Sequence, residues 1–150
     1  MWLPDYARET PDKPAMIVAE RGEVQTYKEL NDRSNQLAQL FWERGLRHGD
    51  HIAVFMENHL RFMEVVWAAF RSGLYVTTVN RYLPADEAAY VINDCMAKAL
   101  VTSNSRREVI AEMTSMIPNC PIRLMLDGAI DGWEAYEPAV AAQKPEPLAE

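Results

Sequence analysis

The sequence predicts an α/β fold, a three-layer sandwich in which a mainly parallel sheet is flanked by helices, with a β-hairpin near the N-terminus. Three observations predict it. Short apolar runs rich in β-branched residues alternate with stretches of helical periodicity. Residues 51–80 hold a strand, a helix and a strand within about 30 residues, the length of a βαβ unit. The connections between these elements are short, as they are in layered α/β domains.

Residues 51–80 form the unit against which the other elements are expected to pack. Its first strand is expected at residues 52–56, and the side chain of Asn58 is expected to cap the helix that follows. Gly73 stands where a glycine in the left-handed conformation ends a helix, and a second strand is expected at residues 75–79. Strands buried on both faces require helices above and below the sheet.

The helix between these strands is apolar over most of its surface. Its polar residues share one narrow side, and they are Arg61, Glu64 and Arg71. The opposite face is expected to be deeply buried and to contain Phe62, Val66 and Phe70. Truncation of a packed phenylalanine at position 70 to alanine would then cost about 3–5 kcal/mol.

Upstream of this unit, residues 15–27 contain two strand-like runs around Gly22, which predicts a hairpin outside the main sheet. Thr26 and Glu29 have the spacing of a capping box. A long helix is therefore expected to begin here and to end at Gly45.

Downstream, two further helix–strand repeats are expected. A helix whose first turn holds Pro84 leads to a strand at residues 99–102. A helix behind a second capping box at Ser105 leads to a strand at residues 122–126. The expected strand order is 75–79, 52–56, 99–102, 122–126.

The pattern changes at residue 126. Residues 1–126 are expected to form one α/β subdomain, and residues 127–150 a weakly structured acidic, proline-containing tail or linker. The last eight residues, 143–150, are expected to have no partner to pack on. A chain that stops in such a segment is expected to continue into something else.

The composition excludes several classes of function. The chain has 150 residues and a formal net charge of −7, which argues against a nucleic-acid partner because phosphate binding needs a basic face. No apolar run approaches the ~20 residues of a transmembrane segment, and the first residues lack the pattern of a secretory signal. Cys95 and Cys120 have no CxxC spacing and are expected to be reduced thiols of a cytoplasmic protein.

Ligands of open parallel sheets bind beyond the carboxyl ends of the strands. The polar residues expected at these ends are Glu57, Asn58, Asn80, Arg81, Ser103 and Asn104. None of these segments has the glycines that let a backbone approach a phosphate, and the chain holds no dinucleotide-binding or P-loop motif. The pair Arg81–Tyr82 lies at a strand end where a cation can meet an acidic ligand, but an ordinary surface arginine is the favoured interpretation.

Two other groups of residues contain residue types that can form a binding site. His48, His51 and His59 are expected in a turn, in a strand and beyond the end of that strand, so they do not converge on one metal ion. Met113 and Met116 are expected to fill a core rather than to line a lipid-facing groove.

Five segments follow one another as in a known family. They are TPDKPAMI, TYKELNDRSNQLAQLF, GLRHGDHIAVFMENHLRFMEVVWAAFRSGLYVTTVNRYL, ADEAAYVINDC and KALVTS. In this order, over roughly residues 8–126, they resemble the amino-terminal part of acyl-CoA synthetases, members of the adenylate-forming family that includes luciferases and peptide-synthetase adenylation domains. The stretches around Trp67 and Asn80 are nearer to fatty-acid–CoA ligases, whereas Pro84 replaces a threonine that often caps the next helix in the family.

The resemblance implies a ligase that activates a small-molecule carboxylic acid, here a fatty acid, with ATP and Mg²⁺ and then transfers the acyl group to coenzyme A. The phosphate-loop, ribose-binding and lysine motifs of the family are absent from this chain, so no catalytic, cofactor-binding or metal-binding residue is assigned to it. The chain alone is expected to be inactive and to bind none of these cofactors. Its expected partner is the remainder of its own ligase chain.

The sequence leaves several alternatives open. They are the acyl chain length, a homodimer, peripheral association with a membrane, and whether the chain was cut or is naturally short. A self-standing α/β binding or interaction module that keeps the fold without the chemistry is the alternative function.

Overall fold

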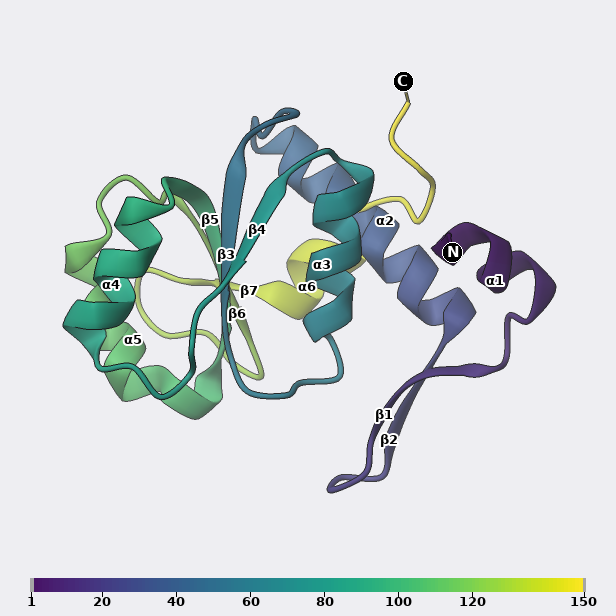
Figure 1. Cartoon of the computed structure of the whole chain (residues 1–150), viewed down its shortest axis with the longest axis horizontal. Helices are drawn as coiled ribbons and strands as arrows, with labels where there is room; N and C mark the ends of the chain where they lie inside the picture. The colour runs from purple at the N-terminus through teal and green to yellow at the C-terminus, as the bar shows by residue number, and fades with distance from the viewer. Residues whose placement is uncertain (1, 150) are drawn as a thin grey trace.

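The computed structural model describes residues 2–149 and has the three-layer α/β architecture that the sequence predicts (Figure 1). Its helices and strands are α1 (Leu3–Glu9), β1 (Pro14–Val18), β2 (Glu23–Thr26), α2 (Tyr27–Glu43), β3 (His51–Phe55), α3 (Phe62–Arg71), β4 (Tyr75–Thr78), α4 (Ala85–Asp94), β5 (Ala97–Ser103), α5 (Arg107–Met113), β6 (Ile122–Leu126), β7 (Glu134–Ala135) and α6 (Tyr136–Ala141).

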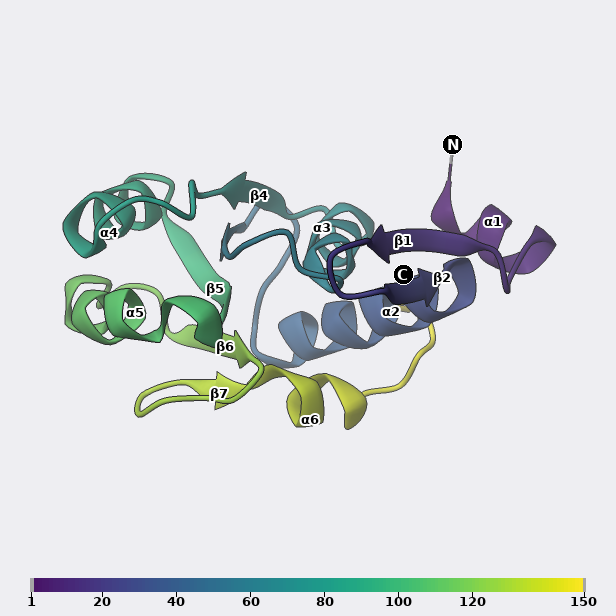
Figure 2. The same cartoon turned by 90° about the horizontal axis from the view of Figure 1, so that it is seen from below.

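The main sheet has the strand order β4-β3-β5-β6-β7, and all of its neighbouring strands pair in parallel. The predicted order of the first four strands is therefore confirmed. Helices α4 and α5 cover one face of the sheet, and α2, α3 and α6 cover the other (Figures 1 and 2). The core is accordingly split by the sheet into two apolar clusters, as a sheet buried on both faces requires.

The predicted hairpin is confirmed as an antiparallel pair of β1 and β2, which lies with α1 at the end of the molecule away from α4 and α5 (Figures 1 and 2). The capping box is confirmed as well. The hydroxyl of Thr26 accepts a hydrogen bond from the Glu29 backbone N–H at 3.2 Å, and the Glu29 carboxylate accepts one from the Thr26 N–H at 2.9 Å. These two bonds satisfy donors that the first turn of α2 leaves free.

Two other predicted caps are wrong. Helix α3 begins at Phe62, and neither Asn58 nor any other side chain caps it. Instead the backbone N–H of Arg61 donates to Nδ1 of His59 at 3.0 Å, so a histidine side chain organises this turn. Ser105 lies in a 3₁₀ turn before α5 rather than at a cap, because its hydroxyl donates to Glu57 at 2.7 Å.

The predicted burial of α3 is partly wrong. Phe70 is 57% exposed and Phe62 is only partly buried, whereas Val66 is buried and Glu64, predicted to be on the solvent side, is fully buried. The buried side of α3 also holds Val65, Ala68 and Ala69, whose small side chains allow α2 and the sheet to approach closely. Glu64 is buried despite its charge because its hydrogen-bond partners lie far away in the sequence and only the fold brings them to it.

Gly73 ends the turn after α3 with a φ of +64°, as the sequence predicts. A Cβ at this position would lie 2.3 Å from Cδ2 of His48, so both the backbone conformation and the space require glycine. We expect Gly73→Ala to lower the free energy of unfolding by more than the roughly 1–2 kcal/mol that the left-handed backbone alone costs, measured by urea denaturation of the chain. Gly22→Ala is the matched control, since Gly22 has the same φ of +64° but nothing within 4 Å. Equal losses of unfolding free energy in the two variants would show that the His48 side chain moves aside at no energetic cost.

The segment after β6, residues 127–149, contains β7 and α6. Its last part lies along α2, where the carbonyls of Gln143 and Pro145 accept hydrogen bonds from Gln36 and Asn35, both at 2.9 Å. The expectation that residues 143–150 lack a partner is therefore wrong for the part that the structure describes. Sequence periodicity cannot reveal such bonds, since their acceptors are backbone carbonyls about a hundred residues away. The division of the chain at residue 126 stays a prediction.

Candidate functional site

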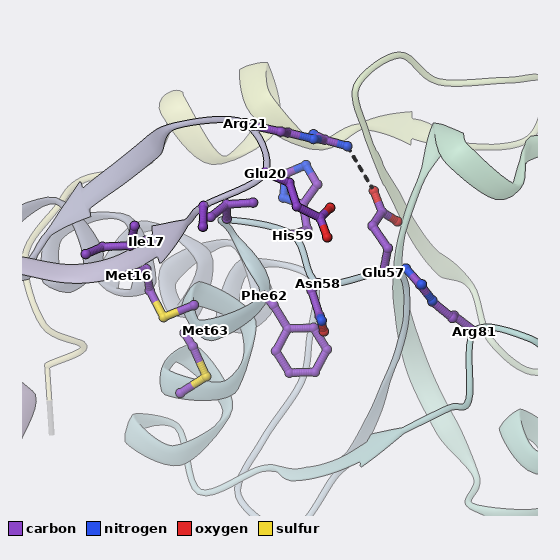
Figure 3. Close-up of a pocket in the computed structure, with 12 residues that line it drawn as sticks. Met16, Ile17, Glu20, Arg21, Glu57, Asn58, His59, Phe62, Met63 and Arg81 are labelled. Atoms are coloured by element: carbon purple, nitrogen blue, oxygen red, sulfur yellow. Dashed lines mark ion pairs between the residues drawn. The ribbon is translucent and has the colours of Figure 1, made fainter.

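The carboxyl ends of β3 and β4 meet the hairpin at a cavity of about 550 Å³ (Figure 3). Of the polar residues predicted at the strand ends, the structure brings Glu57, Asn58 and Arg81 to this cavity. The hairpin supplies residues 16–21 as one wall, and the start of α3 supplies Phe62 and Met63 as another. A volume of this size suits a small-molecule ligand.

The other predicted residues lie nearby but do not line the cavity. Ser103 hydrogen-bonds Glu57, and the amide of Asn104 donates to the carbonyl of Gly128 at 2.7 Å. Asn80 is exposed and accepts a hydrogen bond from the backbone N–H of Tyr82 at 3.0 Å. These residues therefore support the local structure of the sheet edge.

Glu57 is the central charged group of the cavity. The hydroxyls of Ser103 and Ser105 donate to its carboxylate at 2.5 and 2.7 Å, and the guanidinium of Arg21 lies 4.0 Å away. Burial acts to raise the pKa of Glu57, but the two serine hydroxyls, a backbone hydrogen bond and His59 together outweigh it and hold this pKa below its ordinary value. Glu57 is thus an ionised acceptor with its orientation set by the end of β5, which suits it to binding more than to taking up protons.

Glu57, His59 and Asp127 form a group that the sequence did not predict, with one ligand atom of each within 4.8 Å of the others. Nε2 of His59 lies 2.9 Å from the Asp127 carboxylate, and Nδ1 accepts the hydrogen bond from Arg61. The neutral ring therefore carries its proton on Nε2 and donates it to Asp127. A metal ion on Nε2 would need that position deprotonated, so the hydrogen bonds present favour a structural cluster over a metal site.

Asp127 has a φ of +62°, an uncommon conformation for a residue with a side chain. Two contacts hold it there, since its backbone N–H donates to Glu137 at 2.8 Å and its carboxylate meets His59. Strained residues of this kind gather at functional sites. The sequence prediction missed Asp127 because the residue follows the last predicted strand, and its partner His59, before α3, is 68 positions away in the chain.

Two arginines flank Glu57 from opposite sides (Figure 3). Arg21 comes from the turn of the hairpin, and Arg81 follows β4, where its guanidinium lies 4.6 Å from the centre of the Tyr82 ring. The carboxylates of Glu20 and Glu57 balance these two arginines, so the cavity offers a ligand charged groups of both signs beside an apolar wall. None of the described residues in the cavity is a nucleophile paired with a base.

The remaining histidines do not join this site. His51 stacks on Tyr75 with ring centroids 4.8 Å apart, at the other end of the strands, and His48 contacts the position of Gly73. Met113 is fully buried in the core as predicted, whereas the prediction is wrong for Met116, which is exposed in the 3₁₀ turn after α5. Both cysteines are free thiols, and burial raises the pKa of Cys120 to about 12.

Among residues 2–149, no helix has the length and apolarity needed to cross a bilayer.

A second polar cluster lies inside the molecule, and we call it the Glu64 cluster. The Glu64 carboxylate accepts hydrogen bonds from the amide of Gln25 at 2.5 Å and from the hydroxyl of Tyr136 at 2.9 Å. The guanidinium groups of Arg33 and Arg61 approach it to 3.5 and 3.6 Å. Burial raises the pKa of Glu64, while the arginines and hydrogen-bond donors oppose this shift. The cluster joins β2, α2, α3 and α6, and no local pattern in the sequence predicts it.

Comparison with known protein families gives a match over almost the whole chain. The model of the family described as "AMP-binding enzyme" matches residues 3–149. Crotonobetaine/carnitine–CoA ligase of Proteus mirabilis is 32% identical over 109 residues, which cover 70% of this chain and 21% of that protein. Long-chain fatty acid transport protein 1 of Mus musculus is 26% identical over 149 residues, which cover 96% and 23%. The chain thus spans about a fifth of the length of these relatives.

Solved structures show the same fold. An anthranilate CoA ligase, solved in complex with anthranoyl-AMP, superimposes with a TM-score of 0.86 at 16% identity and covers 99% of this chain. A fatty acyl CoA synthetase of Mycobacterium tuberculosis has a TM-score of 0.84 at 19% identity and covers 98%. The chain covers 29% and 28% of these two structures, respectively.

Proposed function

This chain belongs to the AMP-binding enzyme family, and from that premise we propose that it is the amino-terminal part of an adenylate-forming acid–CoA ligase. The observation that carries the proposal is the family match over residues 3–149 together with relatives that are CoA ligases. The proposed partner of the chain is the remaining part of the same ligase, since the relatives are several times longer.

The proposed reaction has two steps. The carboxylate of the acid attacks the α-phosphate of ATP and releases pyrophosphate, which converts a poor leaving group into AMP. The thiol of coenzyme A then displaces AMP and forms the thioester. Charge that develops on the phosphates must be met by preorganised donors and Mg²⁺. A cytoplasmic location is part of this proposal, and the use of ATP and coenzyme A supports it.

The residues of this chain do not fit ATP or Mg²⁺ by themselves. The sequence contains no glycine-rich phosphate loop, and none of the described strand ends offers a backbone cradle for a phosphate. In the proposed ligase, the chain would supply the sheet edge with Glu57, Arg21 and Arg81, and other parts of the enzyme would supply the chemistry. No catalytic residue is assigned here.

A fatty acid is the proposed substrate. This assignment is supported by the stretches around Trp67 and Asn80 and by the relatives named long-chain fatty acid transport proteins. Other relatives are named for crotonobetaine, carnitine and 2-succinylbenzoate, so these acids are the natural competitors in an assay.

The chain of residues 1–150 is expected to show no acid-dependent exchange of pyrophosphate into ATP and no formation of acyl-CoA. The complete product of its gene is expected to form AMP only when an acid and coenzyme A are both present, with fatty acids preferred in a panel that contains the competitors. Exchange is measured with labelled pyrophosphate, and AMP by chromatography, each against a boiled control.

Two outcomes would contradict this proposal. Exchange by residues 1–150 that survives repurification would reveal a site within this chain, and Asn58, Asn80 and Arg81 would be the first residues to mutate. Absence of acid-dependent AMP formation by the complete protein, over the whole panel, would favour a binding module without the chemistry.

A further inference from the structure

Helix α3 is covered on one side only, although it is apolar on two. Its buried side packs against α2 and the sheet through Val65, Ala68 and Ala69. On the other side Trp67 is partly exposed and Phe70 is 57% exposed. A helix that is apolar nearly all round normally lies inside a protein. The composition of α3 therefore indicates that more of its surface is buried than the described residues cover.

The exposed side of α3 continues into a contiguous surface, which we call the aromatic strip and define as Trp2, Trp67 and Phe70. The ring of Trp2 packs edge-on against Trp67 with centroids 5.9 Å apart, and Trp67 packs in the same way against Phe70, also at 5.9 Å. Trp2 and Phe70 are 46% and 57% exposed. Contiguous exposed aromatics are typical of interfaces rather than of a free surface.

The hairpin also exposes apolar side chains that no described residue covers. Ile17 and Val24 face each other across β1 and β2, and they are 64% and 50% exposed. Gln25 is the one buried residue between positions 14 and 26, so no apolar side chain of the hairpin belongs to either core cluster. A two-stranded ribbon is at best marginally stable without another layer against it.

We propose that the aromatic strip and the outer face of the hairpin are the docking surface for the remaining polypeptide of the ligase. This inference rests on the proposed function. The occupant is argued from length, because solved neighbours match this chain over 98–99% of its residues while the chain covers only 28–29% of them. The occupant presents an apolar face, since Trp2, Trp67 and Phe70 carry no charge to satisfy. A second copy of the chain is the competing occupant.

The test uses the complete product of the gene with a thiol placed on the strip. Phe70→Cys is compared with Tyr90→Cys, because Tyr90 is 69% exposed on α4, outside the strip. We expect the thiol of Phe70→Cys to react at least about tenfold more slowly with a maleimide than that of Tyr90→Cys, measured by mass spectrometry of the labelled peptides. Peptide analysis keeps the native Cys95 and Cys120 separate. Phe70→Glu is expected to lower the melting temperature, and Tyr90→Glu is expected to leave it unchanged.

Equal labelling of the two thiols would overturn the proposal. Equal melting temperatures of the Phe70→Glu and Tyr90→Glu variants of the complete protein would overturn it as well. Slow labelling that becomes fast when a dimer is diluted to monomers would assign the strip to a second copy and would also overturn it. The proposed function fails separately. A complete protein that protects Phe70→Cys but forms no AMP from any acid would refute the ligase while leaving the docking surface in place.

Discussion

Truncation of Phe55 to alanine is expected to lower the free energy of unfolding of this chain by about 3–5 kcal/mol, whereas the same change at Phe70 should cost about 1 kcal/mol. Phe55 is fully buried at the end of β3 and belongs to the core cluster beneath α4 and α5. Its removal would leave a cavity that the surrounding side chains cannot fill. Phe70 is 57% exposed, so its truncation removes mainly the ring contact with Trp67.

The measurement is urea denaturation of residues 1–150 with both single variants and the unchanged chain. The m-values should agree among the three proteins, because the surface exposed on unfolding is nearly the same. A loss at Phe70 as large as that at Phe55 would mean that the face of α3 assigned to the surface is buried. It would then restore the burial that helical periodicity predicts for Phe70.

Removal of the Glu64 carboxylate is expected to have an effect of similar size. Glu64→Ala should cost about 3 kcal/mol, because it leaves Tyr136 and Gln25 without their acceptor and two arginines without their counter-ion. Glu64→Gln is the matched variant, since it keeps the shape and an acceptor oxygen but removes the charge. A loss below about 1 kcal/mol for Glu64→Ala would show that the Glu64 cluster adds little to stability.

The same carboxylate predicts a pH dependence with a definite sign. Burial raises the pKa of Glu64 in the folded chain above its ordinary value of 4.5. At a pH between 4.5 and the higher pKa of the folded state, the folded state binds a proton that the unfolded state has lost, so low pH favours folding. The contribution of Glu64 is therefore fully present below pH 4.5 and is lost as the pH rises through its folded-state pKa.

Other carboxyl groups act in the opposite direction, since the pKa values of Asp50 and Glu57 are lowered in the folded chain. The measurement is accordingly the difference in unfolding free energy between the unchanged chain and Glu64→Gln from pH 4 to pH 8. As the pH rises, the unchanged chain should lose unfolding free energy relative to the Glu64→Gln variant. Glu112→Gln, on the exposed side of α5, is the control. A difference that stays constant over this range would contradict the raised pKa of Glu64.

The sequence by itself determined the elements and their order. Period-2 and period-3.6 patterns are local, because the spacing of apolar residues within one segment indicates a strand or a helix whatever the other segments do. The capping box at Thr26 and the glycine at position 73 are also local, because each acts within one turn of backbone. Five segments in a fixed order carried the family resemblance, although none of them holds a catalytic motif.

Only the tertiary structure decided which side of α3 is buried. Helical periodicity places Glu64 on the solvent side and Phe70 in the core, whereas in the structure the partners of Glu64 on β2, α2 and α6 bury the glutamate and leave Phe70 exposed. The same holds for the site, where Glu57 gains its orientation from Ser103 and Ser105, and His59 from Asp127. A hydrogen bond between residues 46 to 72 positions apart leaves no periodic trace, because it depends on where two elements of the fold meet in space.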